Sequence, residues 1–213
     1  MAHTQTITLP HLTSNPLYVS LFENVKNAPF LRQQLLDGNT EFQYAFLDAS
    51  AVLGLHTGLP LANGPQQVLS VGHVLAACFR AVNYMNHNRL KSRNVHSEIV
   101  FSLSPNNNIA ESFRRFGITD TTTSVLAIKV ATNDSITASA VQEHLSRNVE
   151  GDSIPFSDEV KKIYKLDSPP AGGGKKGKAE TKYSGALNGM VDEADERREM
   201  EVYLLGIMAL KGS

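Results

Sequence analysis

The chain has 213 residues, of which 41% are hydrophobic and 19% are charged, and its formal net charge is −1. This composition is typical of a globular protein with one buried core, and it excludes disorder throughout the chain. The near-zero charge excludes binding to nucleic acid or membrane through the overall field of the molecule, so such a contact needs a local patch.

The first half of the chain predicts two strands, two helices and one irregular insertion. Apolar residues indicate a strand over residues 17–22, and Asn27-Ala28-Pro29 opens a helix that Gly38 ends. A second strand is expected over 42–48, and the Gly- and Pro-rich residues 53–66 predict an irregular insertion. Apolar residues at three- and four-residue spacing then predict a long helix over 68–85.

The middle of the chain predicts two further strands and two further helices. The continuous apolar run in residues 98–103 favours a buried strand, and 125–130 favours another. Between them, Asn108 is expected to cap a short helix, with Glu111 reaching back to the cap and Gly117 ending the helix. Residues 135–148 predict a helix.

The last quarter predicts a linker between two helices. Ser157 begins a short helix that includes Tyr164, and residues 167–187 are a low-complexity, flexible linker rich in Gly, Pro, Lys and Ser. Residues 190–210 regain helical spacing. We therefore expect one α+β domain over residues 1–213, with a central mixed or mainly antiparallel sheet packed with helices and a C-terminal helix after the linker.

Features of the chain ends and the single cysteine favour a soluble intracellular protein. Residues 1–16 are polar and show no secretory signal, and the longest apolar run, 203–210, is too short to cross a bilayer. Cys78 cannot form an internal disulfide, which fits a reducing compartment, and it lies on the apolar stripe of the long predicted helix. We expect no contact with a membrane.

The glycine–lysine run at residues 172–178 imitates a phosphate-binding loop. Its spacing fits, but Ala179 stands where a Ser or Thr hydroxyl is needed for magnesium. No buried strand precedes it, so its amides are not fixed around a phosphate, and a mobile basic linker is the default interpretation. A small nucleotide-binding enzyme remains a minor alternative, which substitution of Lys178 would test.

No catalytic or metal set is apparent. The seven histidines are scattered, without a His-x-x-x-His pair or a cysteine set. His96-Ser97-Glu98 would form no relay on a strand, because neighbouring side chains point to opposite faces. We expect neither an enzyme, nor a cofactor, nor a bound metal.

One basic segment is a candidate contact for nucleic acid. Residues 80–93 carry four cations with no acidic residue between them, and Arg114 and Arg115 add two more. A solvated face is the common explanation of such a segment, but cations gathered at one edge would bind phosphates weakly and with strong salt dependence. The candidate nucleic-acid-binding residues are Lys91, Arg93, Arg114 and Arg115.

The block 104–118 identifies a family. Ser104-Pro105-Asn106-Asn107-Asn108, running into Phe113-Arg114-Arg115-Phe116-Gly117-Ile118, resembles the signature of the kinase-binding subunit of the KEOPS (EKC) complex, also called PRPK-binding protein. Segments 21–32 and 160–166 resemble that family as well, in the same order. The chain departs from the family pattern in its insertion at 53–66 and in its longer low-complexity stretch.

The resemblance implies a small α+β protein without catalytic machinery. Family members bind a small atypical kinase/ATPase within a complex that installs threonylcarbamoyl on an adenosine of certain transfer RNAs (tRNAs), and some relatives grip the tRNA 3′ end. The complex is also linked to telomere maintenance and transcription, so the resemblance implies a location in the nucleus and cytoplasm, with chromosome ends as the site of a telomere role. Other subunits would be contacted through the kinase.

For the kinase contact we expect an apolar helical surface drawn from the last helix and the short capped helix. The candidates are Ile109, Phe113, Tyr203, Leu204, Ile207 and Met208. The same apolar pattern would arise if the last helix only packed on its own core. A stand-alone RNA-binding module is the alternative to a kinase-binding adaptor.

Overall fold

The computed structural model describes residues 2–53, 71–156 and 206, and its centre is an open antiparallel sheet. The strands are β1 (Gln5–Ile7), β2 (Leu17–Glu23), β3 (Ala45–Asp48), β4 (Val125–Val130) and β5 (Asp152–Ile154). The order is β1-β2-β4-β3, and β5 also pairs with β2. The expected α+β class with a mainly antiparallel sheet is confirmed, and β3 is an edge strand.

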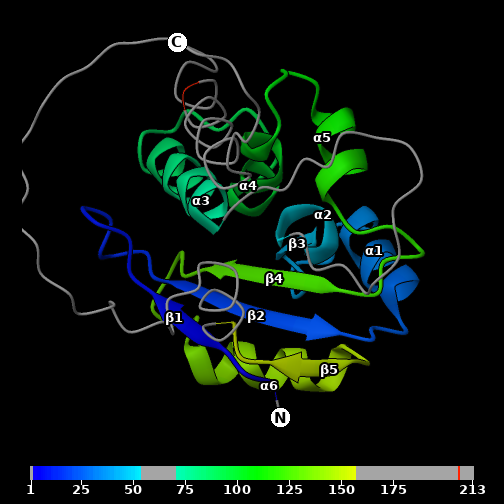
Figure 1. Ribbon diagram of the computed structural model, residues 1–213. Helices are drawn as coiled ribbons and strands as arrows, with labels where there is room; N and C mark the ends of the chain where they lie inside the picture. The colour runs from blue at the N-terminus through cyan, green and yellow to red at the C-terminus, as the bar shows by residue number, and fades with distance from the viewer. Residues whose placement is uncertain (1, 54–70, 157–205, 207–213) are drawn as a thin grey trace, which may run out of the picture.

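Helices cover both faces of this sheet. They are α1 (Ala28–Leu36), α2 (Ala49–Leu53), α3 (Val71–Asn86), α4 (Val95–Leu103), α5 (Ile109–Phe116) and α6 (Ala138–Asn148). Helices α3 and α4 lie over one face and α6 over the other, while α1 and α5 lie toward the same end of the molecule (Figure 1). The chain therefore forms a three-layer arrangement around the sheet.

Strands β2 and β4 are buried on both sides, which explains their continuous apolar sequences. Leu126, Ile128 and Val130 belong to the cluster that contains the apolar side chains of α3 and α4. Val125 and Ala127 belong to the other cluster, with residues of α1 and α6. The alternation along β4 thus divides the core into two halves.

The strand expected over residues 98–103 is wrong, because this segment is helix α4. The side chain of Asn94 caps the helix by accepting the amide of Ser97 at 2.9 Å. Every residue of α4 except Ser97 is buried, so no polar face interrupts the apolar run. A short helix buried all round gives the same sequence pattern as a buried strand.

The other strands and helices that the sequence predicts agree with the described residues. The strands near 17–22, 42–48 and 125–130 and the helices near 28–36, 68–85, 109–116 and 135–148 are confirmed, with small shifts of their ends. Gly38 has a φ of 70°, which confirms the left-handed end of α1. The short elements β1, β5 and α2 were not anticipated. The expectations for residues 54–70, 157–205 and 207–213 lie outside the described residues.

Within the described ranges no helix is both long and apolar enough to span a bilayer. Among the same residues, no group of three or more His, Cys, Asp or Glu side chains lies close enough to hold a metal ion.

Candidate nucleic-acid interface

The asparagine-rich turn before α5 binds mainly to itself. Asn108 Oδ1 accepts the amide of Glu111 at 3.1 Å, which confirms the predicted cap. Asn106 Oδ1 accepts the hydroxyl of Ser104 at 2.8 Å and the amide of Asn108 at 3.2 Å. Asn107 is exposed, and its side chain makes no hydrogen bond within the described residues. Two of the three asparagines are thus explained by local backbone geometry.

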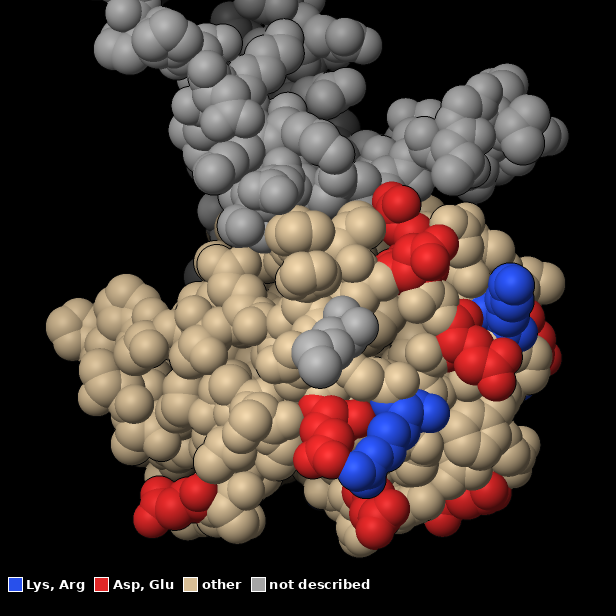
Figure 2. All heavy atoms as spheres, turned by 90° about the horizontal axis from the view of Figure 1, so that it is seen from below, with Lys and Arg blue, Asp and Glu red and all other residues tan. Residues whose placement is uncertain are grey.

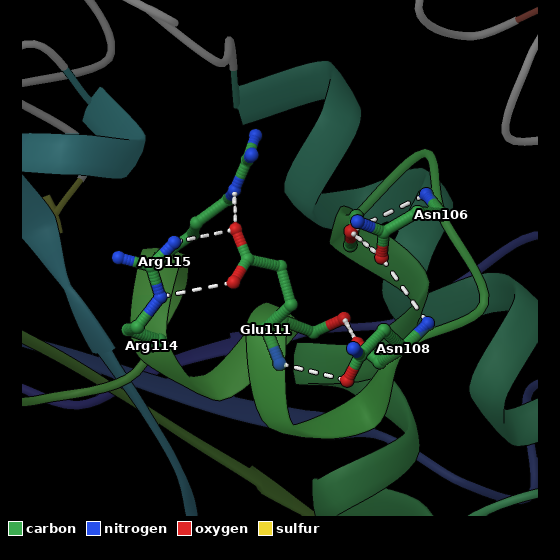
Figure 3. A network of polar contacts seen from close by, with 7 residues as sticks. Asn106, Asn108, Glu111, Arg114 and Arg115 are labelled. Atoms are coloured by element: carbon green, nitrogen blue, oxygen red, sulfur yellow. Dashed lines mark hydrogen bonds and ion pairs between the residues drawn. The ribbon is translucent and has the colours of Figure 1, made fainter.

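Glu111 does not reach back to the cap as expected. Its carboxylate turns along the helix and accepts Arg114 Nε at 2.9 Å and Arg114 Nη2 at 2.7 Å (Figure 3). Arg115 Nε donates to the same carboxylate at 2.5 Å. The hydrogen bonds from the two arginines lower the pKa of Glu111 to about 2. Because one carboxylate serves both cations, the three residues together carry a single net positive charge.

Helix α5 ends at Gly117, where the backbone turns extended and no side chain would fit. A Cβ at this position would lie 2.6 Å from the carbonyl oxygen of Phe113. Gly117 has an extended backbone and bridges to Leu47 of β3, so it joins the end of α5 to the edge of the sheet. The bridge between Gly117 and Leu47 places the end of α5 beside β3.

The second basic segment is the 87–94 loop, which joins α3 to α4 and carries Lys91 and Arg93. The side chain of Glu98 in α4 is fully buried and holds this loop. Its Oε2 accepts the amides of Lys91 at 3.0 Å and Ser92 at 2.8 Å, and the Ser92 hydroxyl at 2.7 Å. The other oxygen, Oε1, is buried and has no partner among the described residues.

A cleft of about 620 Å³ lies beyond the edge strand β3, between α1 on one side and α4 and α5 on the other. The 37–44 loop, which joins α1 to β3, forms one wall, and the end of the 87–94 loop forms another. The lining includes three arginines and four aromatic rings: Arg32, Arg93, Arg114, Phe42, Tyr44, Phe46 and Phe113.

The three arginines of the cleft differ in their partners. Arg32 pairs with Asp120 at 3.2 Å, and Arg114 pairs with Glu111. Arg93 makes no hydrogen bond or ion pair with any described residue. Its guanidinium lies close to Gly38, just after α1, because a Cβ on Gly38 would be 3.2 Å from Arg93 Nη1. Among the described residues that line the cleft, Arg93 is therefore the cation whose charge no partner compensates.

The aromatic wall is built by residues at two-residue spacing. Phe42, Tyr44 and Phe46 lie on the same side of the β3 segment, and the rings of Tyr44 and Phe46 stack with their centroids 5.2 Å apart. Lys129 of β4 lies behind this wall with its Nζ 4.6 Å from the centre of the Tyr44 ring. Lys129 Nζ also donates to the carbonyl oxygen of Gln43 at 2.7 Å, and burial lowers the pKa of Lys129 to about 8.

The structure brings together part of the sequence-predicted site. Arg93, Arg114, Phe113 and Gly117 line the cleft, whereas Lys91 and Arg115 are exposed outside its lining. Ile109, at the start of α5, is 39% exposed. The predicted contacts Tyr203, Leu204, Ile207 and Met208 lie outside the described residues.

The sequence interpretation missed Arg32 and the aromatic wall. The alternation of aromatic residues at 42, 44 and 46 is a signal that one face of a strand carries three rings. The isolated cation at Arg32 gave no comparable signal, because its approach to the cleft depends on how α1 packs.

Cys78 and His96, two further groups noted in the sequence, are buried in the core. Burial raises the pKa of Cys78 to about 12. His96 Nε2 accepts the amide of Val130 at 3.0 Å, and burial together with the charge of Lys129 lowers the pKa of His96 to about 3. His96, Ser97 and Glu98 therefore form no relay, although the reason is the separate partners of His96 and Glu98 and not the strand geometry expected.

The charge on the α6 side differs from that of the cleft. On the face seen from below, acidic side chains are more frequent than basic ones, and the basic ones form no continuous patch (Figure 2). A polyanion would be repelled from this face. The cleft combines Arg93, which has no partner among the described residues, with two paired arginines and with Phe113, the one half-buried ring of the described lining, whereas Phe42, Tyr44 and Phe46 are at most 5% exposed. A phosphate beside Arg93 and a base against Phe113 would suit this arrangement.

Comparisons with known proteins agree with the resemblance noted in the sequence. Residues 22–57 and 64–212 match the family described as kinase binding protein CGI-121. The chain is 44% identical over 220 residues to the EKC/KEOPS complex subunit cgi121 of Aspergillus fumigatus, covering 98% of this chain and 97% of the relative. It is 41% identical to the subunit of the same name in Phaeosphaeria nodorum, covering 99% and 100%, and 31% identical to that of Schizosaccharomyces pombe, covering 75% and 87%.

Proposed function

The chain belongs to the CGI-121 family of kinase-binding proteins, and from that premise we propose that it is a non-catalytic subunit of the EKC/KEOPS complex. It binds the small kinase of the complex and supplies a site for tRNA during threonylcarbamoyl-adenosine modification. The name of the matched family supports the kinase contact, and the arginine- and aromatic-lined cleft supports the tRNA contact.

The kinase contact is assigned to an apolar helical surface. Within the described residues, Ile109 supports it, because this large aliphatic side chain stays 39% exposed at the start of α5. Exposed apolar side chains at a rigid helix are typical anchors of protein interfaces. The predicted last helix would extend this surface through Ile207.

A pull-down with the cognate kinase tests this contact. We expect Ile109→Asp and Ile207→Asp each to weaken the complex, because a charge would be buried without a partner at the interface. Phe79→Asp is a matched control, since Phe79 on α3 is also 39% exposed. Absence of any complex, or a complex indifferent to Ile109→Asp and Ile207→Asp, would reject the assignment.

The tRNA contact is assigned to the cleft. Phosphates would meet Arg93 and Arg114, and an unpaired base would stack on Phe113, the half-buried ring of the lining. A single-stranded end fits such a site better than a duplex, because its bases are free to leave their stack. We therefore expect the chain to bind the 3′ end of tRNA.

Titration of fluorescently labelled tRNA, with and without its terminal CCA, measures this binding directly. We expect tighter binding of the intact tRNA and a fall in affinity with salt, because phosphate contacts release counterions. Equal affinity for the two tRNAs would reject the assignment of the cleft to the 3′ end. Binding of tRNA by a chain that forms no complex with the kinase in the pull-down would favour a stand-alone RNA-binding module.

The nucleotide-binding alternative falls on residues 172–178, outside the described residues. ATP affinity before and after Lys178→Ala tests it, and unaltered weak binding would eliminate it. We extend the proposal to roles in telomere maintenance and transcription, and to a location in the nucleus and cytoplasm, on the resemblance to the family alone.

A further inference from the structure

We propose that two buried charges of opposite sign, Glu98 and Lys129, are positioning residues that hold the two loop walls of the cleft in the geometry that binds its ligand. This inference rests on the proposed function of the cleft in binding RNA. Neither residue lines the cleft, and neither makes an ion pair with another described residue. Each bonds instead to the backbone of one wall.

Glu98 holds the cationic wall. The side chain is fully buried, and burying a carboxylate without a counter-ion is unfavourable unless several hydrogen bonds compensate. Three donors from Lys91 and Ser92 converge on Oε2, and all three belong to the 87–94 loop. The next residue along this loop is Arg93, the cation that has no partner among the described residues. Glu98 thus fixes the backbone from which Arg93 reaches into the cleft.

Lys129 holds the aromatic wall. Its side chain comes from β4, passes behind the edge strand, and donates to the carbonyl oxygen of Gln43. The ammonium also lies over the ring of Tyr44, which fixes the next residue of the same wall. The other titratable groups near this site are Tyr44 and Glu41 from the 37–44 loop, His144 and Arg147 from α6, and His96 from α4. Tyr44 Oη lies 3.1 Å from His144 Nδ1.

Ordinary packing requires neither of these charges. An apolar residue at 98 or 129 would fill the same space without desolvating a charge, but it would leave the loop groups that now bond to Glu98 or Lys129 without that partner. What an apolar residue would lose is the directed bond to the loop backbone. The two charges therefore act on the preorganisation of the walls, which lowers the ordering cost of binding.

The first test measures binding of intact tRNA to the full chain carrying Glu98→Gln. We expect the affinity to fall by about tenfold, because a charge-assisted hydrogen bond to the loop is lost. The slope of log affinity against log salt should become shallower by about one contact, because Arg93 is no longer held at its phosphate. Glu143→Gln is the matched control, since Glu143 on α6 is exposed and pairs with Arg147. It makes the same change in net charge.

A double-mutant cycle separates positioning from general structural damage. If Glu98 acts through Arg93, the chain with both Glu98→Gln and Arg93→Ala should bind no more weakly than Arg93→Ala alone. Additive losses, or an unchanged affinity in Glu98→Gln, would overturn the proposal for this wall. If Glu98→Gln does not fold, Ser92→Ala removes one of the three bonds and should reduce affinity by about threefold.

Lys129→Met is the corresponding variant for the aromatic wall, with Lys26→Met as the exposed control. We expect weaker binding of intact tRNA, an unchanged salt slope, and a thermal unfolding midpoint equal to or above that of the natural chain. A variant that is less stable and binds equally well would overturn the proposal for this wall.

Hydrogen exchange keeps the inference testable if the chain binds no tRNA. We expect the amides of Lys91 and Ser92 to exchange faster in Glu98→Gln, and those of the 37–44 loop to exchange faster in Lys129→Met, with β2 unchanged. Faster exchange without tRNA binding would reject the function of the cleft and leave the positioning roles standing. Unchanged exchange in both variants would reject the positioning roles whatever the tRNA result.

Discussion

Helices α4 and α5 begin in the same way and use their first-turn glutamates in opposite ways. Both have an asparagine cap, Asn94 or Asn108, that accepts an amide three residues on. Glu98 of α4 turns inward and binds the loop that precedes its helix. Glu111 of α5 turns outward and binds two arginines in the last turn of its own helix.

The consequence for the cleft is that its cations are not equivalent. Glu98 orders a loop and leaves Arg93 without a partner among the described residues, while Glu111 partly neutralises Arg114 and Arg115. The basic pair that is most conspicuous in the sequence is therefore the less available one. A count of cations along a chain overestimates binding wherever a carboxylate on the same helix turn already occupies them.

The largest effect is expected at acid pH, through the buried end of α4. The pKa of His96 is lowered to about 3 in the folded chain, so protonation of His96 favours the unfolded chain. Its contribution to stability is complete above about pH 6.5 and is lost as the pH falls from there toward 3. We expect a loss on the order of 4 kcal/mol across this window.

Urea unfolding of the natural chain and of His96→Gln at several pH values isolates this contribution. The natural chain should be the more stable one at pH 7, and the difference in unfolding free energy should shrink as the pH falls. A difference independent of pH would show that His96 is not held neutral by burial. Comparing the two chains at each pH removes the effect of the carboxylates that titrate in the same window.

The second effect is at the end of α5. Gly117→Ala would place a Cβ 2.6 Å from the carbonyl oxygen of Phe113, so the backbone must shift. We expect a loss of about 2–3 kcal/mol in the unfolding free energy, measured by chemical denaturation. Ala110→Gly on the exposed surface of α5 sets the scale for comparison, since exchanging alanine for glycine in a helix costs only about 1 kcal/mol. An effect of Gly117→Ala no larger than that of Ala110→Gly would contradict the close approach.

The third effect separates the two groups of cations. Arg93→Ala should lower the affinity for intact tRNA by about tenfold and flatten the salt dependence by about one contact, because no carboxylate among the described residues pairs with Arg93. Arg114→Ala should lower it less, since Arg114 is already paired with Glu111. Arg147→Ala on α6 is the control. Fluorescence anisotropy over a range of salt concentrations measures these affinities. Equal losses of affinity in Arg93→Ala and Arg114→Ala would contradict the distinction between the two groups of cations.

The smallest effect has the opposite sign. Glu111→Gln removes the carboxylate that binds Arg114 and Arg115, so more positive charge faces the cleft. We expect the affinity for tRNA to rise by about two- to threefold at low salt, with the gain disappearing at high salt. The same titration with Glu143→Gln gives the effect of net charge alone. A fall in affinity would mean that Glu111 is needed to orient the arginines.

The sequence predicted the elements whose environment differs between their faces. Helix α3 shows a clear apolar stripe, and the N-cap of α5 was read correctly from Asn108, because capping depends on residues three positions apart. Helix α4 was misread because it is buried all round, and its periodic signal is therefore absent. The role of Glu98 was missed for the same reason, since a buried carboxylate in an apolar run is explained only by the loop that it binds.

For this protein, the sequence by itself determined the fold class, the family and most local structure, because caps, turns and periodic burial are encoded within a few residues. Only the tertiary structure decided which cations of the described residues lack a partner, which loops form the cleft, and that Arg32, Arg93 and Phe42 line it together beside the edge strand. These residues lie far apart in the chain. Their distances follow from how α1, α4 and α5 pack around β3, which no local pattern records.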